Sequence, residues 1–451
     1  MPTPNGTSSG VPVFPPGPKS LAVLDTLAAV IGRANYTGLY GIVLSSGSGS
    51  QLTDADGNTY LDCLSCASST SLGYGQEFLV DAYASAARTL QQSCFTYSPN
   101  KLAIALANLL ITLMPGNFDK RVMIGLSGSD AAGGAIKAVR KFTKLQGIIH
   151  FKNDYHGSTG ISQQASDFGT LDDGLYAFHP EYIEVDFPRT PAEAVIAEIK
   201  IAALLATGKV GGLICEAIQG DAGVVVPPAG FIATLRQLTS RYGALLVCDE
   251  VQSGMGRTGK WWAYEHDGIV PDLMVTAKGI TSGYAPLSAV IGRADVLNSL
   301  APGQHIFTYG GHPPSAAVAL ATLNYITAQG LIDHAGQLGE ALIAALTSVA
   351  VNYPAIMLEV RGKGLMIGIQ INISVDPLAG KIFASRCVEL GVYVGFFGVN
   401  GDVVRIEPPL IIQQADADLI VQTVVQVAAE MAAGTIPPQT VENVKTYSIG
   451  V

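Results

Sequence analysis

The sequence has few charged residues and no long hydrophobic run. Charged side chains make up only 14% of its 451 residues, whereas hydrophobic ones make up 48%. This ratio indicates much buried or subunit-facing surface, as in an obligate oligomer, although a well-packed monomer also fits. The net charge of −10 argues against nucleic acid or an anionic membrane as a partner. No apolar run approaches the length of a membrane-spanning helix.

Cysteine is also scarce, with six residues in the chain. Only Cys63 and Cys66 have the spacing of a metal or redox pair, and no second pair completes a zinc site. Cys215 and Cys248 lie inside apolar segments, where we expect them to act as small core residues. We therefore expect no metal and a reduced, cytoplasmic protein. Residues 1–20 are rich in Pro, Gly and Ser and lack the basic and apolar regions of a signal peptide, which predicts a flexible arm.

The length of the chain predicts two or more domains. Across residues 71–328, helical patterns alternate with short apolar segments. This alternation predicts an α/β domain with a mostly parallel sheet and helices on both faces. The expected strands of this large domain are Arg121–Leu126, Gly147–Phe151, Gly211–Glu216, Ala244–Asp249, Asp272–Ala277 and Leu287–Gly292.

Residues 329–451 show a different pattern, which predicts a smaller α+β domain. Residues 21–70 are expected to join it. They begin with helical spacing at Leu21–Ala34, a candidate cover for a partner subunit, and continue as a β-hairpin at Gly47–Asp62 with its turn at residues 56–58. In the C-terminal part we expect a helix at His334–Val351, strands near 356–360, 365–371, 392–396 and 403–406, and a helix at 414–433.

Two of the expected strands end in an ionisable residue. Residues 244–251 are apolar up to Asp249, and residues 271–279 are mostly apolar up to Lys278. The carboxyl ends of parallel strands are where open α/β sheets bind ligands. There a lysine can form an imine with a carbonyl cofactor, and a carboxylate can keep a ring nitrogen protonated. Pyridoxal phosphate needs both groups, although a plain ion pair for Lys278 and a helix cap for Asp249 are the bland alternatives.

The segments around these two residues resemble those of the class III aminotransferases. Residues 248–259, Cys-Asp-Glu-Val-Gln-Ser-Gly-Met-Gly-Arg-Thr-Gly, are similar to the family's DE-V-Q-x-G-x-G-R-T-G stretch. Lys278-Gly279, followed by Pro286-Leu287-Ser288, is similar to its K-G-(x)n-P-L-S-A element. The resemblance extends from about residue 47 to about residue 410. It implies pyridoxal phosphate as cofactor, fold type I of the enzymes that use it, and Lys278 as the imine-forming residue with Asp249 at the pyridine nitrogen.

The remaining cofactor contacts follow from further matches. Val251 would pack on the ring and Gln252 would reach its hydroxyl group. Tyr155, in the Tyr155-His156-Gly157 element, would stack on the ring, whereas His156 is expected to lie in the second shell or the core. Gly157 and Glu216 complete the expected contacts on this side of the cofactor.

Two segments of the sequence are expected to bind the phosphate of the cofactor. Gly128 and Ser129 follow a strand and open a helix, where free amides bind anions. A simple Ser/Asp helix cap explains this motif equally well. Thr308 lies in Phe307-Thr-Tyr-Gly-Gly-His-Pro313, which is similar to the family's T-x-G-G-N-P loop. In the family this threonine reaches the phosphate of the neighbouring subunit, which implies a homodimer or tetramer.

Two residues bear on the substrate. Arg405, in a stretch similar to the family's L-R-x-x-P-P-L, would clamp a carboxylate with two parallel hydrogen bonds. Its alternative is a surface ion pair with Glu407. Asp221 replaces the second glutamate of the family's E-P-x-Q-G-E-G-G pattern. The isoleucine epimerase and aminocaprolactam racemase branch carries aspartate at this turn, and Arg405 favours a free amino acid over a lactam.

The net reaction depends on where the α-proton of the substrate returns. Return by Lys278 to the cofactor carbon gives transamination with a keto acid, whereas return to the opposite face of the α-carbon gives racemisation and needs a second acid. Asp221 is our candidate for that acid. Gly-Ser-Asp at residues 128–130, Ala67–Gly75 and the tail at 449–450 also favour a racemase or epimerase. The alternatives are an aminotransferase and a catalytically silent relative. A dehydrogenase is disfavoured, because no strand precedes a dinucleotide glycine fingerprint.

Overall fold

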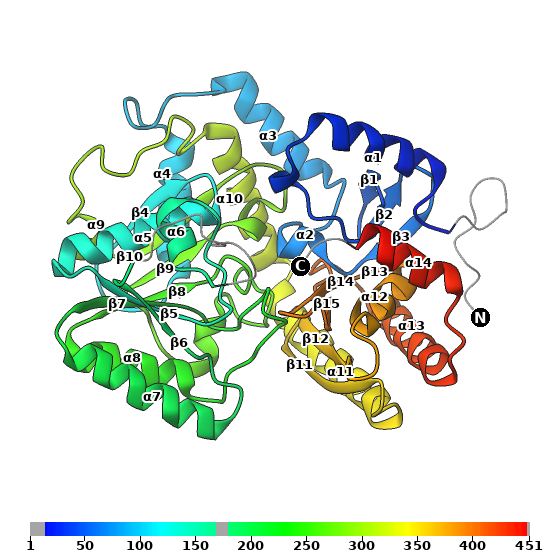
Figure 1. Ribbon diagram of the computed structural model, residues 1–451. Helices are drawn as coiled ribbons and strands as arrows, with labels where there is room; N and C mark the ends of the chain where they lie inside the picture. The colour runs from blue at the N-terminus through cyan, green and yellow to red at the C-terminus, as the bar shows by residue number, and fades with distance from the viewer. Residues whose placement is uncertain (1–13, 168–178, 449–451) are drawn as a thin grey trace. The chain divides into compact units, whose positions relative to one another are not determined.

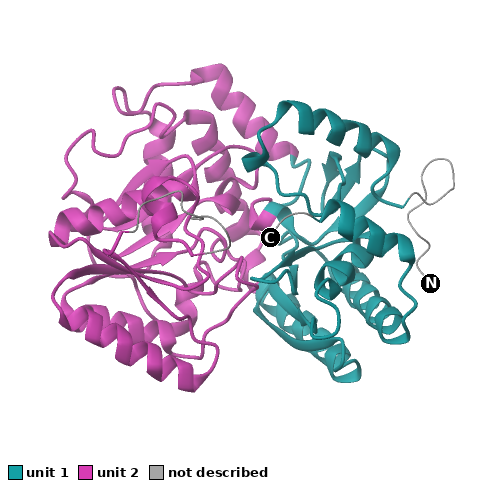
Figure 2. Cartoon of the chain, in the orientation of Figure 1, with its two compact units in different colours: residues 1–66, 72–76, 334–451 teal, residues 67–71, 77–333 magenta. Residues whose placement is uncertain are grey.

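The computed structural model describes residues 14–167 and 179–448. The chain divides into two compact units (Figure 2). Unit 1 comprises residues 1–66, 72–76 and 334–451, and unit 2 comprises residues 67–71 and 77–333. The expected arm lies outside the described residues as far as residue 13, and so does the tail at 449–450.

Unit 2 is built on a seven-stranded sheet whose strand order is β4-β10-β9-β8-β7-β5-β6 (Figure 1). The pairs among β5, β6, β7, β8 and β9 are parallel, and β10 is antiparallel to both of its neighbours. The six predicted strands are confirmed to within two residues, and β6 at the edge was not predicted. The strands are β4 (Lys120–Gly125), β5 (Gly147–Phe151), β6 (Tyr182–Val185), β7 (Val210–Glu216), β8 (Leu245–Asp249), β9 (Leu273–Thr276) and β10 (Ser288–Arg293).

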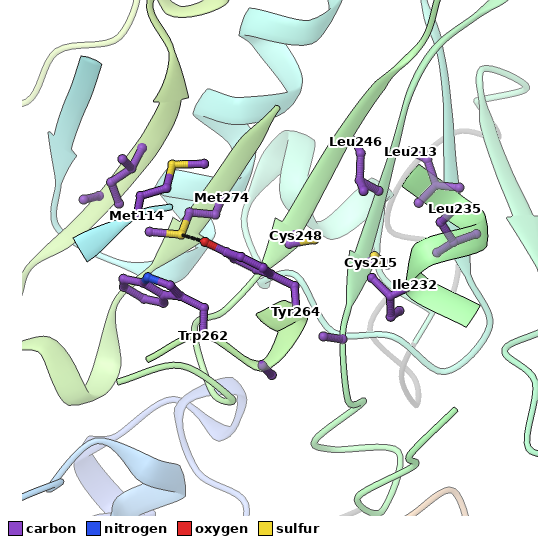
Figure 3. Packing of buried hydrophobic residues seen from close by; sticks show 14 of the residues in the cluster. Met114, Leu213, Cys215, Ile232, Leu235, Leu246, Cys248, Trp262, Tyr264 and Met274 are labelled. Carbon is purple, nitrogen blue, oxygen red and sulfur yellow. Dashed lines mark hydrogen bonds between the residues drawn. The ribbon is translucent and has the colours of Figure 1, made fainter. Parts of the chain in front are cut away.

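Helices cover both faces of this sheet because successive strand residues point to opposite sides. Leu246 and Cys248 of β8 pack in one core cluster with residues of α4, α7, α8 and α10, whereas Leu245 and Val247 pack in a second cluster with α5. Figure 3 shows the first cluster, in which Cys215 and Cys248 lie among apolar side chains as predicted. The helices of this unit are α3 (Glu77–Leu90), α4 (Lys101–Leu113), α5 (Gly128–Thr143), α6 (Gly160–Gln164), α7 (Pro191–Ala206), α8 (Phe231–Tyr242), α9 (Ala294–Leu297) and α10 (Pro313–Ala328), with 3-10 turns at η2 (Ala263–Asp267) and η3 (Lys278–Thr281).

Unit 1 contains two four-stranded sheets. The first has the order β1-β2-β3-β13 and the second, which is antiparallel, β11-β12-β15-β14. The predicted strand at 392–396 is in fact two short strands, because β13 pairs with β3 whereas β14 pairs with β15. The predicted hairpin turn is present, and Gly57 adopts a φ of +94° there. The strands are β1 (Leu44–Ser48), β2 (Gln51–Asp54), β3 (Thr59–Asp62), β11 (Met357–Lys363), β12 (Met366–Ile371), β13 (Val392–Tyr393), β14 (Gly395–Phe397) and β15 (Val403–Ile406).

The helices of unit 1 agree only partly with the sequence patterns. The first begins three residues earlier than expected, because Pro18 suits the first turn of a helix, and it ends earlier as well. The helix at 414–433 is confirmed, and α12 and α14 were not predicted. The elements are α1 (Pro18–Val30), η1 (Arg33–Asn35), α2 (Ser65–Ser68), α11 (Leu331–Asn352), α12 (Ala379–Glu389), α13 (Gln414–Ala433) and α14 (Pro438–Tyr447).

Within the described ranges, no single helix combines the length and apolarity needed to cross a membrane. Two bent pairs, α10 with α11 and α13 with α14, meet that criterion jointly by length and composition.

Candidate active site

A cavity of about 440 Å³ opens in unit 2 at the carboxyl ends of its parallel strands. The strand register explains why ionisable residues meet there, since Glu216 at the end of β7 lies opposite Asp249 at the end of β8. Strand β9 runs parallel to β8 and is followed by Lys278. Nine of the predicted cofactor-binding residues line this one cavity: Gly128, Ser129, Tyr155, Gly157, Glu216, Asp249, Val251, Gln252 and Lys278.

Lys278 enters the cavity from a strained backbone position. Its backbone φ is +40°, in the left-handed region that residues other than glycine rarely adopt. Such strain persists only where the surrounding structure enforces it, and it is frequent at functional sites. Its amine Nζ donates a hydrogen bond to Oε1 of Gln252 at 3.1 Å. The amine therefore points toward the loop that follows Asp249.

Asp249 is 4% exposed, and each of its carboxylate oxygens already accepts a hydrogen bond. Oδ1 accepts from the amide of Val251 at 3.0 Å, and Oδ2 lies 2.7 Å from Nδ1 of His156. On its other side, His156 Nε2 lies 3.0 Å from Asp154 Oδ2. Burial alone would lower the pKa of His156, but the two carboxylates raise it well above its usual value. The imidazole ring of His156 therefore lies between two carboxylates, Asp154 and Asp249.

Glu216 is the second buried carboxyl group of the cavity, at 6% exposure. Its Oε1 accepts from the amide of Tyr155 at 3.0 Å and its Oε2 from the amide of Gly220 at 2.8 Å. Burial raises the pKa of Glu216 to about 8, and the nearby Asp249 carboxylate adds to this effect while His156 opposes it. Glu216 is therefore protonated at neutral pH and ties two loops to the cavity.

The amino end of α5, where the phosphate cradle is expected, is a capped helix start. Ser127 caps the helix by accepting from the amide of Asp130, whose side chain in turn accepts from the amide of Ser127. The amides of Gly128 and Ser129 have no acceptor among the residues that the structure describes. The helix cap is therefore confirmed, and because it uses other groups than these two amides, the phosphate site stays a prediction.

Gly157 closes the cradle from the other side. A side chain at this position would collide with Ser129, and its φ of +126° strongly favours glycine. A comparable contact fixes Gln252, since Gly220 leaves no room for a Cβ beside the Gln252 amide. Gly157 and Gly220 thus lie directly against Ser129 and Gln252, two residues that line the cavity.

The loop that carries Val251 and Gln252 is organised by Glu250. This side chain is fully buried and accepts hydrogen bonds from Ser253 Oγ and from the amides of Ala263 and Tyr264, each at 2.9 Å. Burial raises the pKa of Glu250 to about 7. Its bonds hold the loop to the segment around η2, which keeps Val251 and Gln252 at the cavity wall.

Three predicted residues do not line the cavity. Asp221 lies in the turn after β7, and its charge adds to the effect of burial in raising the pKa of the cavity residue Tyr155. Thr308 is exposed, and its carbonyl accepts from Gln92 at 3.3 Å. Arg405 belongs to unit 1, where its guanidinium lies 3.2 Å from Glu407 and 3.4 Å from the centre of the Phe397 ring. The alternative ion pair with Glu407 is therefore present, but it is fully buried and does not lie at the surface as expected.

Other residues of the site were not assigned a role in it from the sequence. Ser69 and Tyr284 line the cavity, and Asp154 lies behind it. Tyr284 could have been found from its place between Lys278 and Pro286 in the matched element. Asp154 gave no signal beyond its position two residues before His156.

The donor set of the cavity fits pyridoxal phosphate. The cofactor has an aldehyde for the Lys278 amine, a ring nitrogen that suits the buried Asp249 carboxylate, and a phosphate that suits the free amides of Gly128 and Ser129. Each of these groups has a matching residue on the wall of the same cavity.

Comparisons with known proteins agree with this assignment. The family model of "Aminotransferase class-III" matches residues 32–428. The chain is 33% identical to the alanine/serine racemase of Pyrococcus horikoshii (94% of this chain, 93% of that protein) and 32% identical to the leucine/methionine racemase of Thermococcus litoralis (92% and 96%). It is also 32% identical to the 4-aminobutyrate aminotransferase of Mycobacterium leprae (88% and 93%). Among solved structures, the ornithine aminotransferase of Toxoplasma gondii with partial occupancy of pyridoxal phosphate matches with a TM-score of 0.83 at 27% identity (92% and 95%).

A matched pair of glycine substitutions tests the cradle. We expect Gly157→Ala to weaken binding of pyridoxal phosphate by about tenfold or more, equivalent to about 1.4 kcal/mol, because the added Cβ displaces Ser129. Gly160→Ala is the control, since Gly160 also has a positive φ but nothing lies within 4 Å of its added Cβ. Fluorescence titration of the cofactor-free proteins measures both affinities. Equal affinities for the two variants would contradict the cradle.

The protonation of Glu216 predicts a pH-dependent stability. An unfolded glutamate ionises near pH 4.3, roughly, whereas the folded protein keeps the Glu216 proton up to about pH 8. Between these values only the folded state binds the proton, so stability falls as the pH rises, by up to about 1.4 kcal/mol per pH unit. The variant Glu216→Gln lacks this proton, so its stability should fall less as the pH rises. Unfolding temperatures of the cofactor-free proteins between about pH 5 and about pH 8 measure the difference, and parallel curves would refute the assignment.

Proposed function

The chain belongs to the class III aminotransferase family of pyridoxal-phosphate-dependent enzymes, and from this membership we propose that it is an amino-acid racemase or epimerase. The observation that carries the proposal is the presence of two acid–base groups on different elements, Lys278 after β9 and Asp221 after β7. Racemisation needs such a pair, because a proton must leave one face of the α-carbon and arrive on the other.

Asp221 is supported as the second group by its electrostatic effect on Tyr155. Burial is the main cause of the raised pKa of Tyr155, and the charge of Asp221 raises it further. Because Tyr155 lines the cavity, this effect supports a place for Asp221 near the side of the cavity that carries Tyr155. Two racemases are similar to the chain over more than nine tenths of its length, which favours the same net reaction.

Each residue has a defined task in this proposal. When bound, pyridoxal phosphate withdraws electrons from the α-carbon of the substrate, so that its proton can be removed. Lys278 takes and returns that proton on one face, and Asp221 serves the opposite face. Asp249 keeps the ring nitrogen protonated.

The remaining cofactor residues orient the ring and hold the phosphate. Tyr155 and Val251 pack against the ring, Gln252 reaches its hydroxyl group, and Glu216 fixes the loops on either side. Gly128 and Ser129 hold the phosphate, with Thr308 of a neighbouring subunit completing its site. The active form is therefore proposed to be a homodimer or tetramer.

Arg405 is proposed to bind the substrate carboxylate. Its guanidinium is fully buried and stacked on Phe397, so it is desolvated and rigidly held. A planar guanidinium binds a carboxylate through two parallel hydrogen bonds. Because Arg405 is paired with Glu407, a substrate carboxylate has to compete with Glu407 for the guanidinium of Arg405 or share it. Recognition of this kind favours a free amino acid.

Amino-group transfer to a 2-oxo acid is the second candidate. The similarity to the 4-aminobutyrate aminotransferase favours it, and transfer needs Lys278 alone as acid and base. A silent cofactor-binding relative is the third candidate. The joint presence of Lys278, Asp249 and Tyr155 at one cavity argues against it.

A single incubation separates these reactions. The holoenzyme is incubated in deuterated water with each of a panel of L-amino acids and no keto acid, and the products are analysed by chiral chromatography and mass spectrometry. We expect inversion of at least one amino acid with uptake of one deuterium at the α-carbon. Reaction that occurs only with added 2-oxoglutarate or pyruvate, consumed in equal amount, would show transfer instead.

Two variants assign the faces in the same assay. Asp221→Asn should lower the rate of inversion by about 100-fold or more, while exchange of the α-proton with retained configuration continues through Lys278. Lys278→Ala should abolish both processes, and Glu198→Gln on the exposed face of α7 serves as the control. Equal loss of exchange and inversion in Asp221→Asn would remove Asp221 from the second face.

A further inference from the structure

His156 faces a carboxylate at each of its two ring nitrogens. Nδ1 lies 2.7 Å from Asp249 Oδ2, and Nε2 lies 3.0 Å from Asp154 Oδ2. A neutral imidazole has only one N–H, so one of these contacts would set two lone pairs against each other. With both carboxylates ionised, the geometry is satisfied only by an imidazolium that donates to both sides.

Asp154 is built to remain an ionised carboxylate although it is completely buried. Its Oδ2 accepts from the amide of Phe151 at 2.7 Å, and its Oδ1 accepts from the amide of Asp167 at 3.1 Å. His150 Nδ1 lies 3.4 Å from the same Oδ1. Burial would raise the pKa of Asp154, but His156 and His150 together hold it below its usual value. A buried charge without such partners would be costly.

We propose that Asp154 is a positioning residue for the cofactor, which holds His156 in its doubly protonated form and thereby fixes the charge and direction of the Asp249 carboxylate. The inference rests on the proposed role of Asp249 at the ring nitrogen and not on the net reaction. Asp154 touches neither the cavity nor the cofactor, and it acts entirely through the imidazole ring. The buried chain runs Asp154–His156–Asp249 from the interior to the cavity wall.

The charges around the Asp154–His156–Asp249 series explain why Asp154 matters. Asp249 lies opposite Glu216 on the neighbouring strand, and both groups face His156. The imidazolium offsets the Asp249 charge, and Asp154 compensates the imidazolium. Beyond Asp154 lie His150 and, farther out, Asp167, Glu184 and Lys152. Without the Asp154 charge, His156 can lose its Nε2 proton, and Asp249 then faces a neutral ring.

The Asp154–His156–Asp249 series also fixes the orientation of the Asp249 carboxylate. Asp249 accepts one hydrogen bond from Val251 and one from His156, so its plane is set by a backbone amide and by a ring that cannot turn. His156 cannot turn because its second nitrogen is held by Asp154 and its backbone amide donates to Ser166 Oγ at 2.8 Å. The Asp249 oxygens therefore keep a constant direction toward the cavity.

The test is the protonation state of His156, observed by ¹⁵N NMR of histidine-labelled protein with and without pyridoxal phosphate. His156→Gln assigns its signal among the seven histidines of the chain. In the unaltered protein we expect both ring nitrogens to stay protonated from about pH 6 to about pH 9. In Asp154→Asn, the titration midpoint of His156 should shift down into that window. Titration within the window in the unaltered protein would already overturn the inference, even if the variant failed to fold.

The absorbance of the bound cofactor provides the second readout. The holoenzyme of Asp154→Asn should gain a pH-dependent absorbance change that coincides with the His156 titration and that the unaltered holoenzyme lacks. Ser166→Ala is the matched control, since it loosens the same loop without changing any charge near the ring. An equal change in Ser166→Ala would reduce Asp154 to a loop support and contradict the inference.

The two readouts separate this inference from the proposed function. NMR of the cofactor-free protein reports the Asp154–His156 link whatever reaction the enzyme catalyses. A His156 midpoint that shifts without any change in the cofactor absorbance would break the link to Asp249 and overturn the inference. Loss of racemisation in the panel assay would leave both readouts unaffected.

Discussion

Two carboxyl groups, Glu216 and Asp249, end neighbouring parallel strands directly opposite each other, and both are buried. Two like charges on directly opposed residues of neighbouring strands repel each other strongly in a poorly solvated site. The structure resolves the conflict in two ways. Burial raises the pKa of Glu216 to about 8, whereas Asp249 meets a ring nitrogen of His156, whose own pKa is raised well above its usual value by Asp154 and Asp249. The two similar side chains thus meet different surroundings, two backbone amides for Glu216 and one amide with an imidazole ring for Asp249.

The surrounding loops supply the hydrogen-bond partners of these two carboxyl groups. The loop after β5 places His156 against Asp249, with Asp154 on the other side of the His156 ring. The same loop donates the amide of Tyr155 to Glu216. The turn after β7 returns an amide, from Gly220, to Glu216. Buried polar groups that are fully hydrogen-bonded make a rigid site, whereas partly satisfied ones would destabilise it. The rigidity needed to hold a planar cofactor therefore follows from electrostatics that the strand register imposes.

The strained backbone of Lys278 fits the same picture. Lys278 is the first residue of η3 and has a positive φ, and Gln252 accepts a hydrogen bond from its amine. Gln252 is in turn fixed by the close approach of Gly220. The amine is thus aimed by the loops that already serve the two carboxyl groups.

Much of the fold was predictable from the sequence because its signals are local. The central strands β5, β7, β8 and β9 are buried on both faces and read as short apolar runs, so they were found to within one or two residues. Edge strand β6 is short and only partly buried, and its pattern does not stand out from a loop. The division of residues 392–396 into two strands depends on distant partners, β3 and β15, which no local pattern reveals.

The candidate site shows the same contrast between local and distant signals. Residues within matched motifs, such as Lys278 and Asp249, line the cavity where their strand-end positions placed them. Asp154 escaped notice because its importance lies in contacts with His156, and through it with a residue 95 positions away (249 − 154 = 95). Thr308 and Arg405 do not line this cavity, so their roles remain proposals.

The central claim is that the buried charges hold pyridoxal phosphate and that it is attached through Lys278. Borohydride reduction of the cofactor-saturated enzyme, followed by peptide mass mapping, tests this claim most directly. We predict a phosphopyridoxyl group on the peptide that contains Lys278. An unmodified Lys278 peptide, or the group on any other lysine, would contradict the account.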